Sequence, residues 1–471
     1  MKNSYRARWA IAAFVGATLL LTSCNFKDRL LAPQNPGVVD QAAVGTAAAA
    51  LALRVGAIGR IRNVVDGGDQ RLWQQGGHLA DEYKNSDFQI TRQDIDRRTI
   101  ATSNGEFPWA TIHQPRGFLF DAIEAMEKFL PDSTSMIGEL YMGLGFIEMS
   151  LAENYCNGTP LGRTVGGEAH YSGPLTNVQV FDTALAHFET ALTKLGAKTD
   201  VPSVAVRRVT TILKARVLVD KGQYAAAAAL VTTATVPTTY QYVFTTSASS
   251  NAAAEDNGHW QFNINNARVT LGDSFDIVGG QPNLIRNALP FASAGDPRVP
   301  MKKGGPTAAE DGITPMFYQQ LWANRDDPIP MASGIDARLI EAEARLNAAP
   351  NAPDIAGMMT ILNALRTTSQ RLGNYNVGVM PAIATTPTTM DEATTLFFRE
   401  KAFWTFGRGQ RLSDLRRLMR QYHRPEDQVF PTGVYSFAGT AAGTYGHDVN
   451  FPIPDGELPN PNFTACLDRL P

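Results

Sequence analysis

The sequence has 471 residues, 44% of them apolar and 18% charged, which is enough apolar chain to bury one large core or two smaller ones. Its 42 basic and 45 acidic side chains leave a formal net charge of −3, so there is no electrostatic reason to expect nucleic acid or anionic lipid as a partner. Beyond residue 21, no segment approaches the length of apolar chain that spans a membrane.

The N-terminus is predicted to be an export signal. A basic stretch precedes the apolar run of residues 9–21, which is too short to span a membrane. The tetrapeptide that ends at Cys24 resembles the lipobox of bacterial lipoproteins, in which the cysteine sulfur is acylated. We therefore expect residues 1–23 to be a signal peptide, Cys24 to be a lipid anchor, and residues 24–39 to be a tether. The alternative is an ordinary cleaved signal with a chance cysteine.

Export would place the other two cysteines, Cys156 and Cys466, in an oxidising compartment where a disulfide persists. Cys156 follows a predicted helix, and Cys466 lies five residues before the C-terminal Pro471. A bridge between them would hold a chain end that otherwise frays. We predict this disulfide; the alternative is two separate buried thiols.

Helical periodicity dominates the first half of the sequence. Apolar residues recur at steps of three and four in residues 136–155, 178–195 and 204–219, which predicts core-facing helices. Gly222 then precedes an alanine-rich helix that reaches Val231, and this hairpin resembles a tetratricopeptide unit. A general alanine-rich hairpin explains the segment equally well.

The middle of the sequence has a different amino-acid composition. Residues 237–327 are rich in Thr, Ser, Asn, Gly and Pro, which predicts loops with one or two brief strands, one of them at residues 259–264. Helical patterns return at residues 336–346, 356–366 and 392–422. The predicted fold is mainly α, with tetratricopeptide-like helix pairs, a loop-rich insertion and a few short strands.

Several motifs in the second half occur in the order found in the SusD/RagB family of nutrient-uptake proteins. They lie in residues 296–298, 338–346, 362–366, 399–415 and 451–461. The chain resembles that family. The resemblance implies a surface-exposed lipoprotein of an outer membrane that captures a glycan or related nutrient without chemistry. It also implies a partner, a SusC-like TonB-dependent transporter. It predicts one domain at 40–471, divided into a helical part (40–235), a loop-rich part (236–335) and a C-terminal part (336–471).

The charged residues of the 399–415 motif are expected to hold the fold rather than a ligand. Arg399, Glu400, Arg411 and Asp414 are predicted to lie on one helix, where spaced ion pairs form. Arg408 stands where the family usually has a glutamate, which puts the local pattern of ion pairs in doubt.

Glycan sites combine aromatic faces that stack on sugar rings with polar groups that bind the hydroxyls. Aromatic residues beside polar ones give six candidate binding residues: Trp73, Asp81, Trp109, Trp260, Tyr318 and Trp322. For each tryptophan the alternative is a core position. A scaffolding or peptide-binding lipoprotein would not need exposed aromatics, so the burial of Trp73, Trp260 and Trp322 discriminates between the two functions.

No enzyme motif of the HExxH, GxSxG, P-loop or CxxC type occurs, so we do not expect an enzyme. Glu341 and Glu343 lie two apart on a predicted helix and point to different faces. A glycoside hydrolase with two distant carboxylates remains an alternative. No cofactor follows from the sequence. The acidic clusters at residues 66–69 and 326–327 leave a calcium ion as an alternative, although such runs are usually solvated, and no metal site is predicted.

Overall fold

The computed structural model describes residues 45–471, apart from 67, 69, 105–107, 167, 250–255 and 350–351. The predicted signal peptide, Cys24 and the tether lie outside the described residues. Residues Ala47–Pro471 form one compact unit. None of the helices described in it is both long and apolar enough to cross a membrane.

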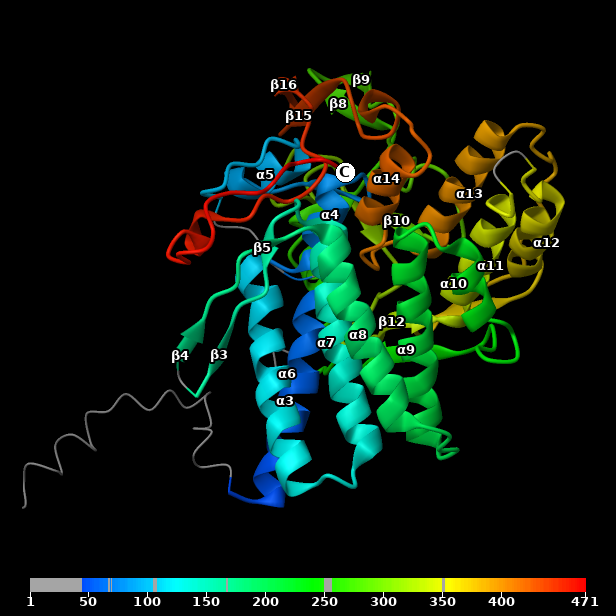
Figure 1. The fold of residues 1–471 in the computed structure, drawn as a ribbon. Helices are drawn as coiled ribbons and strands as arrows, with labels where there is room; N and C mark the ends of the chain where they lie inside the picture. Colours follow the sequence, from blue (N-terminus) through cyan, green and yellow to red (C-terminus); the bar gives the residue numbers. More distant parts are fainter. Residues whose placement is uncertain are drawn as a thin grey trace, which may run out of the picture. The chain divides into compact units, whose positions relative to one another are not determined.

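The first half of this unit is helical (Figure 1). Its helices are α3 (Ala47–Val65), α4 (Leu72–Leu79), α5 (Ile90–Asp96), α6 (Trp109–Phe129), α7 (Thr134–Asn154), α8 (Asn177–Leu195), α9 (Val201–Asp220) and α10 (Tyr224–Leu230). Helices α7 to α10 confirm the helices predicted from periodicity. The sequence patterns do not single out α3 to α6.

Helix α7 is the centre of the helical part and is buried along most of its length. Two of its glycines allow neighbouring helices to approach closely. A Cβ atom added at Gly143 would lie 2.6 Å from Ile61 of α3, and one added at Gly145 would lie 2.6 Å from Phe188 of α8. Both distances are too short for real contacts, so these positions exclude larger residues from the helix interfaces.

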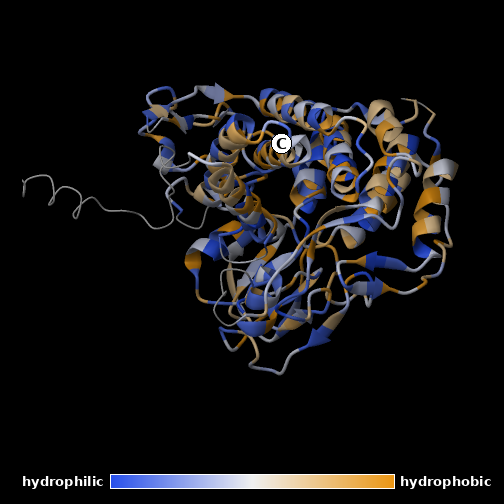
Figure 2. Cartoon of the chain, turned by 90° about the horizontal axis from the view of Figure 1, so that it is seen from below, coloured by the Kyte–Doolittle hydropathy of each residue, from blue (hydrophilic) through white to orange (hydrophobic). Residues whose placement is uncertain are grey.

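Local signals define the helix pairs that follow. Thr176 and Gln179 form a capping box at the start of α8, and the side chain of Asp200 accepts a hydrogen bond from Ser203 at the start of α9. Gly222 adopts a φ of +72° in the short turn to α10. Viewed from below in Figure 2, the helices carry both apolar and polar segments, as amphipathic helices do.

The strands are short and pair in two-stranded antiparallel sheets: β1 (Tyr83–Asn85) with β7 (Val269–Leu271), β2 (Thr159–Pro160) with β5 (Pro174–Leu175), β3 (Arg163–Val165) with β4 (Glu168–His170), β6 (Gln241–Phe244) with β12 (Ile329–Ser333), β8 (Phe275–Val278) with β9 (Gln281–Leu284), β10 (Met301–Lys303) with β11 (Phe317–Gln319), β13 (Gln370–Leu372) with β14 (Tyr375–Val377), and β15 (Val434–Phe437) with β16 (Thr440–Thr444). The middle segment thus contains more strands than the one or two predicted.

One predicted strand is wrong. Residues 259–264 were expected to be extended, but Trp260–Asn265 form a short π-helix, η3. Asn257 begins this turn, because its side-chain oxygen accepts a hydrogen bond from the Trp260 N–H and its carbonyl accepts one from the Gln261 N–H. An alternating pattern of apolar and polar residues gives no indication of such a side-chain cap, so the sequence pattern predicted a strand instead.

The C-terminal part contains α11 (Gly334–Leu346), α12 (Ile355–Arg366), α13 (Met390–Trp404) and α14 (Arg411–Arg420), and the short 3-10 helices η4 (Glu426–Gln428) and η5 (Asp455–Glu457). The single helix predicted for residues 392–422 is therefore corrected to two. Gly407 and Gly409, with φ of +66° and +65°, break it. A Cβ atom at Gly409 would lie 2.1 Å from the Trp73 ring, so this turn requires glycine.

The predicted fold-holding residues join distant motifs through buried ion pairs. Glu400 pairs with Arg298 at 2.6 Å and with Arg366 at 2.9 Å. Lys401 of α13 pairs with Asp414 of α14 at 2.6 Å. These contacts connect the motifs at residues 296–298, 362–366 and 399–415 to one another. The charged residues of these three motifs are therefore explained by packing contacts within the fold.

Arg399 is exposed and lies over the Phe403 ring, so it does not join this set of pairs. Arg408 does find a partner, since its guanidinium pairs with Asp336 at 2.7 Å. Burial would raise the pKa of the Asp336 carboxyl, but Arg408 and hydrogen bonds from Gln410 and Ser333 hold that pKa below its ordinary value. The arginine at position 408 is therefore accommodated by a carboxylate on α11.

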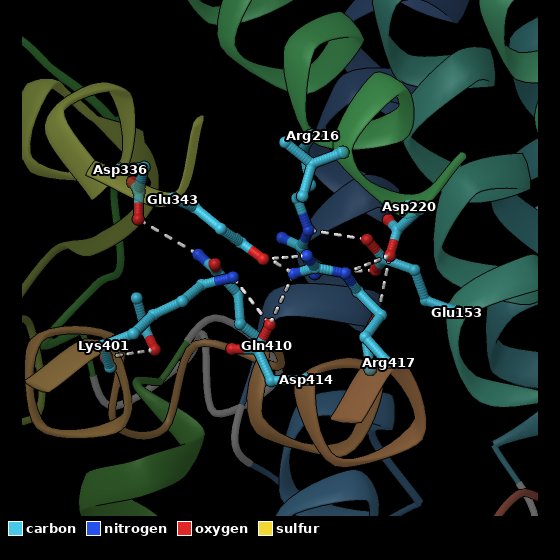
Figure 3. Close-up of polar contacts among 12 residues, drawn as sticks. Glu153, Arg216, Asp220, Asp336, Glu343, Lys401, Gln410, Asp414 and Arg417 are labelled. Atoms are coloured by element: carbon cyan, nitrogen blue, oxygen red, sulfur yellow. Dashed lines mark hydrogen bonds and ion pairs between the residues drawn. The ribbon is translucent and has the colours of Figure 1, made fainter. Parts of the chain in front are cut away.

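Figure 3 shows a network of buried charges between α7, α9, α11 and α14. Arg216 contacts both carboxylate oxygens of Glu153 at 2.6 Å. Arg417 pairs with Glu343, with Asp414 at 3.2 Å and with Asp220 at 3.6 Å. The free space beside these side chains is about 20 Å³, which holds roughly one water molecule. These charges compensate one another and leave no room for a ligand.

The C-terminal tail runs along the end of α7. Cys156 and Cys466 form a disulfide, with their Cα atoms 6.1 Å apart. The Phe451 carbonyl accepts a hydrogen bond from the Cys156 N–H, and the Asn157 carbonyl accepts one from the Leu467 N–H. Two stretches of the tail are thus held against residues 154–157.

Candidate functional site

Two of the aromatic candidates lie in the core. Trp73 and Trp322 are each 2% exposed. Trp73 packs against Gly409, and Trp322 stacks on His259 with ring centroids 4.3 Å apart. This corrects the expectation that they present open faces to a ligand. The alternative weighed for each tryptophan, a core position, is the one observed for both.

Three further candidates are half-buried. Trp109 begins α6 and packs on His113 and Tyr155, with centroid distances of 4.2 and 4.9 Å. Trp260 begins the π-helix η3, and Tyr318 lies on β11. None of the three lines the cavity of about 330 Å³ in the loop-rich part. Their role in binding stays a prediction.

The sixth candidate, Asp81, does line that cavity. Both of its carboxylate oxygens accept hydrogen bonds from Arg411, at 2.7 and 2.8 Å, and one also accepts the Leu289 N–H at 2.9 Å. Because both oxygens of the Asp81 carboxylate already accept hydrogen bonds, this side chain forms part of the cavity wall and is not free to bind a ligand.

The cavity lies in the loop-rich part and has a volume of about 330 Å³. This volume falls at the lower end of the range of small-molecule sites, about 300 to 1,000 Å³. Its walls come from β1, β7, β8, β9, β10 and β11 and from Pro431 and Tyr445, which lie before and after the β15–β16 hairpin. Apolar and aromatic side chains form much of the lining: Leu271, Phe275, Ile277, Pro282, Ile285, Pro315, Phe317, Pro431 and Tyr445.

A buried ion pair forms one wall of the cavity. The Lys84 ammonium lies 2.6 Å from the Asp276 carboxylate, donates a hydrogen bond to the Ser436 carbonyl at 2.8 Å and lies over the Tyr435 ring. Because Lys84 comes from β1 and Asp276 from β8, this pair fixes the two strands on either side of the cavity.

Asp96 lies beside this pair and is 4% exposed. It accepts hydrogen bonds from the Asn85 N–H at 3.0 Å and from the Tyr435 hydroxyl at 2.7 Å. Burial raises the pKa of its carboxyl to about 6, although Lys84 opposes the rise. Asp96 is therefore a buried carboxylate that is mostly ionised at neutral pH.

Three groups at the cavity remain available to a ligand. Asp273 is half-buried and accepts hydrogen bonds from the Ser274 N–H at 2.7 Å and the Ser293 hydroxyl at 2.8 Å, without a cationic partner among the described residues. The Tyr445 hydroxyl makes no hydrogen bond to any residue that the structure describes. Phe275 is 55% exposed, so its ring is open to solvent beside the cavity.

Sequence reasoning missed Asp273, Phe275 and Tyr445. The rule of an aromatic beside a polar residue applies to Asp273 and Phe275, which lie two apart in the loop-rich part, but phenylalanines were not considered. Tyr445 reaches the cavity from the far end of the sequence, and no local pattern indicates that. Within the described residues, no group of three or more His, Cys, Asp or Glu side chains is arranged to hold a metal ion.

No protein-family model matches the sequence, and no curated protein matches it. Solved structures do match. A SusD superfamily protein from Bacteroides fragilis has a TM-score of 0.60 at 14% identity, covering 89% of this chain and 99% of that one. A SusD-like carbohydrate binding protein from Bacteroides vulgatus has a TM-score of 0.58 at 15% identity, covering 89% of this chain and 97% of that one.

A laminarin binding SusD-like protein also has a TM-score of 0.58, at 15% identity, and covers 90% of this chain and 99% of its own. These matches extend over nearly the whole described chain and include its loop-rich part. At this level of identity they establish the architecture. The mainly α fold with short two-stranded sheets, predicted from the sequence, is confirmed, and the protein has the SusD-like fold of the SusD/RagB family.

Proposed function

We propose that this protein is a lipoprotein of the outer-membrane surface that captures a glycan and delivers it to a SusC-like TonB-dependent transporter, without catalysing a reaction. The observation that carries the proposal is the SusD-like fold over about 90% of the chain. The sequence that ends at Cys24 supports the anchor, and the division of residues 40–471 into three parts belongs to the same proposal.

The cavity beside Phe275 supports glycan capture in the loop-rich part. An open aromatic ring next to carboxylate and hydroxyl groups is the combination that sugar rings require. Phe275, Asp273 and Tyr445 bring these groups together at one place. Trp73 and Trp322 are buried and cannot contribute this combination, so we assign the ligand to the cavity.

Scaffolding or peptide binding is a second candidate, because the burial of Trp73 and Trp322 is what such a function allows. A binding screen of the soluble, lipid-free protein against poly- and oligosaccharides separates the two. Calorimetry should detect binding to at least one glycan class, and product analysis of the same samples should find no cleavage. Cleavage would favour a glycoside hydrolase. Absence of binding to every glycan in the panel would favour scaffolding or peptide binding.

The anchor has its own test. Replacing Cys24 by serine removes the sulfur that carries the lipid, so we expect the folded variant to leave the membrane fraction. Fractionation of cells that produce the wild type and Cys24→Ser shows the difference. Equal membrane retention of the two would contradict the proposed anchor.

A further inference from the structure

The cavity in the loop-rich part has an excess of carboxylates. Its lining contains four acidic and two basic side chains: Asp81, Asp96, Asp273 and Asp276, against Lys84 and Lys303. Asp81 is neutralised by Arg411 through two hydrogen bonds of 2.7 and 2.8 Å. Asp276 is neutralised by Lys84 at 2.6 Å. The charges that remain are those of Asp96, Asp273 and Lys303.

These three remaining charges differ in their exposure. Asp96 is buried beside Lys84, which Asp276 already neutralises, and Asp273 is half-buried and forms no ion pair with any residue that the structure describes. Lys303 is exposed on β10, where water screens its charge. Two carboxylates share Lys84 and a third has no cation, so the inner surface of the cavity is negative, and a partly desolvated carboxylate without a cation is costly to the protein. A cationic ligand would offset that cost.

We infer that the cavity selects a ligand that carries a primary amine, so that the captured glycan contains non-acetylated amino sugars. This inference rests on the proposed function and adds the ligand class. An ammonium group can donate a hydrogen bond to the Asp273 carboxylate, and the sugar ring can pack on Phe275. A uronic acid would instead bring a further negative charge into a negative cavity.

The carboxylates are not arranged as a metal site. Among the described residues, no three His, Cys, Asp or Glu groups converge as metal ligands do. Asp96 is bound by Asn85 and Tyr435, and Asp273 by serines, which hold the two carboxylates in separate hydrogen-bond networks. An organic amine among apolar walls fits this arrangement better than an inorganic cation with its demand for many oxygen ligands.

The test is calorimetric titration with three oligosaccharides of equal length: glucosamine oligomers, N-acetylglucosamine oligomers and galacturonic acid oligomers. We expect the glucosamine oligomers to bind at least about tenfold more tightly than either of the others. The Asp273→Asn variant keeps the side-chain volume and loses the charge. It should lower the affinity for glucosamine oligomers by about tenfold or more, as expected for a lost charge-assisted hydrogen bond, and lower the affinity for the acetylated oligomers by a smaller factor, so that the preference for the amine falls.

Two further variants control this result. Glu310 is an exposed carboxylate outside the cavity, so Glu310→Gln should bind all three oligomers as the wild type does. Lys303→Gln removes the rim cation and should leave amine binding equal or stronger. Weaker amine binding by Lys303→Gln, or equal affinities of the wild type for all three oligomers, would overturn the inference while the glycan-binding function stands. Absence of binding to these and to every neutral glycan of the wider screen would contradict both.

Discussion

Between α9, α11 and α14 the Arg417 guanidinium is enclosed by Glu343, Asp414 and Asp220. In the cavity of the loop-rich part, by contrast, Asp273 has no cation beside it among the described residues, and Asp96 shares Lys84 with Asp276. The free volume is about 20 Å³ beside the paired charges and about 330 Å³ in the cavity. Buried charges that satisfy one another hold helices in place. Charges left unpaired beside an open volume can hold a ligand.

The first prediction tests the region of paired charges. Arg417→Ala leaves Glu343 and Asp414 buried without their cation, so we expect the free energy of unfolding to fall by about 3 to 5 kcal/mol. Urea unfolding followed by circular dichroism measures this. Arg345→Ala is the matched control, because the Arg345 side chain is 60% exposed and its removal should cost about 0.5 kcal/mol or less. Equal losses for the two variants would contradict the account.

The second prediction concerns the disulfide that holds the tail against the helical part. The double variant Cys156→Ala, Cys466→Ala opens a link across 310 residues of sequence and should lower the free energy of unfolding by about 2 to 4 kcal/mol. Thermal unfolding with and without a reducing agent measures the loss. The wild type should respond to the reductant and the double variant should not; a reductant effect on both would show that it acts elsewhere.

The third prediction lies at the boundary of the two regions. Burial raises the pKa of the Glu82 carboxyl from 4.5 to about 8, and the Gly407 N–H donates to this carboxyl at 2.9 Å. Between these two pKa values the folded protein keeps a proton that the unfolded chain releases, so Glu82 makes stability fall as pH rises. Glu82→Gln removes this dependence.

We expect Glu82→Gln to gain roughly 1 to 3 kcal/mol of stability relative to the wild type between pH 5 and pH 8. Denaturant unfolding at several pH values gives both profiles. Other buried acids such as Asp66 contribute equally to the two proteins, so the difference between the profiles reports on Glu82 alone. Parallel profiles would show that the carboxyl is ionised throughout this range.

The sequence predicts the helical part well, because its information is local. Steps of three and four residues specify α7, α8 and α9, and Gly222 marks the turn to α10. The break between α13 and α14 was missed, because Gly407 and Gly409 are required there by the packing of Trp73 and Trp322, which lie far away in the sequence. The periodicity of apolar residues within one segment gives no information about packing against residues that are distant in the sequence.

The cavity is largely beyond sequence reasoning for the same reason. Asp81, Asp273 and Tyr445 meet in it although they are separated by most of the chain. The search for aromatic residues beside polar ones selected mainly tryptophans. Trp73 and Trp322 instead bury their large apolar surfaces in the core. Exposed Phe275 was missed because only tryptophans and a tyrosine were selected beside polar residues, although Asp273 lies two residues before it.

The central claim, that the cavity receives the ligand, has a direct test in a variant that fills it. Ala288 lines the cavity, so Ala288→Phe occupies part of its volume, while Ala229→Phe places the same side chain at an exposed position of α10. Calorimetric titration with the tightest-binding glycan of the screen compares both with the wild type. We predict that Ala288→Phe loses binding while remaining folded and that Ala229→Phe binds normally. Wild-type affinity in Ala288→Phe would place the ligand elsewhere and contradict the account.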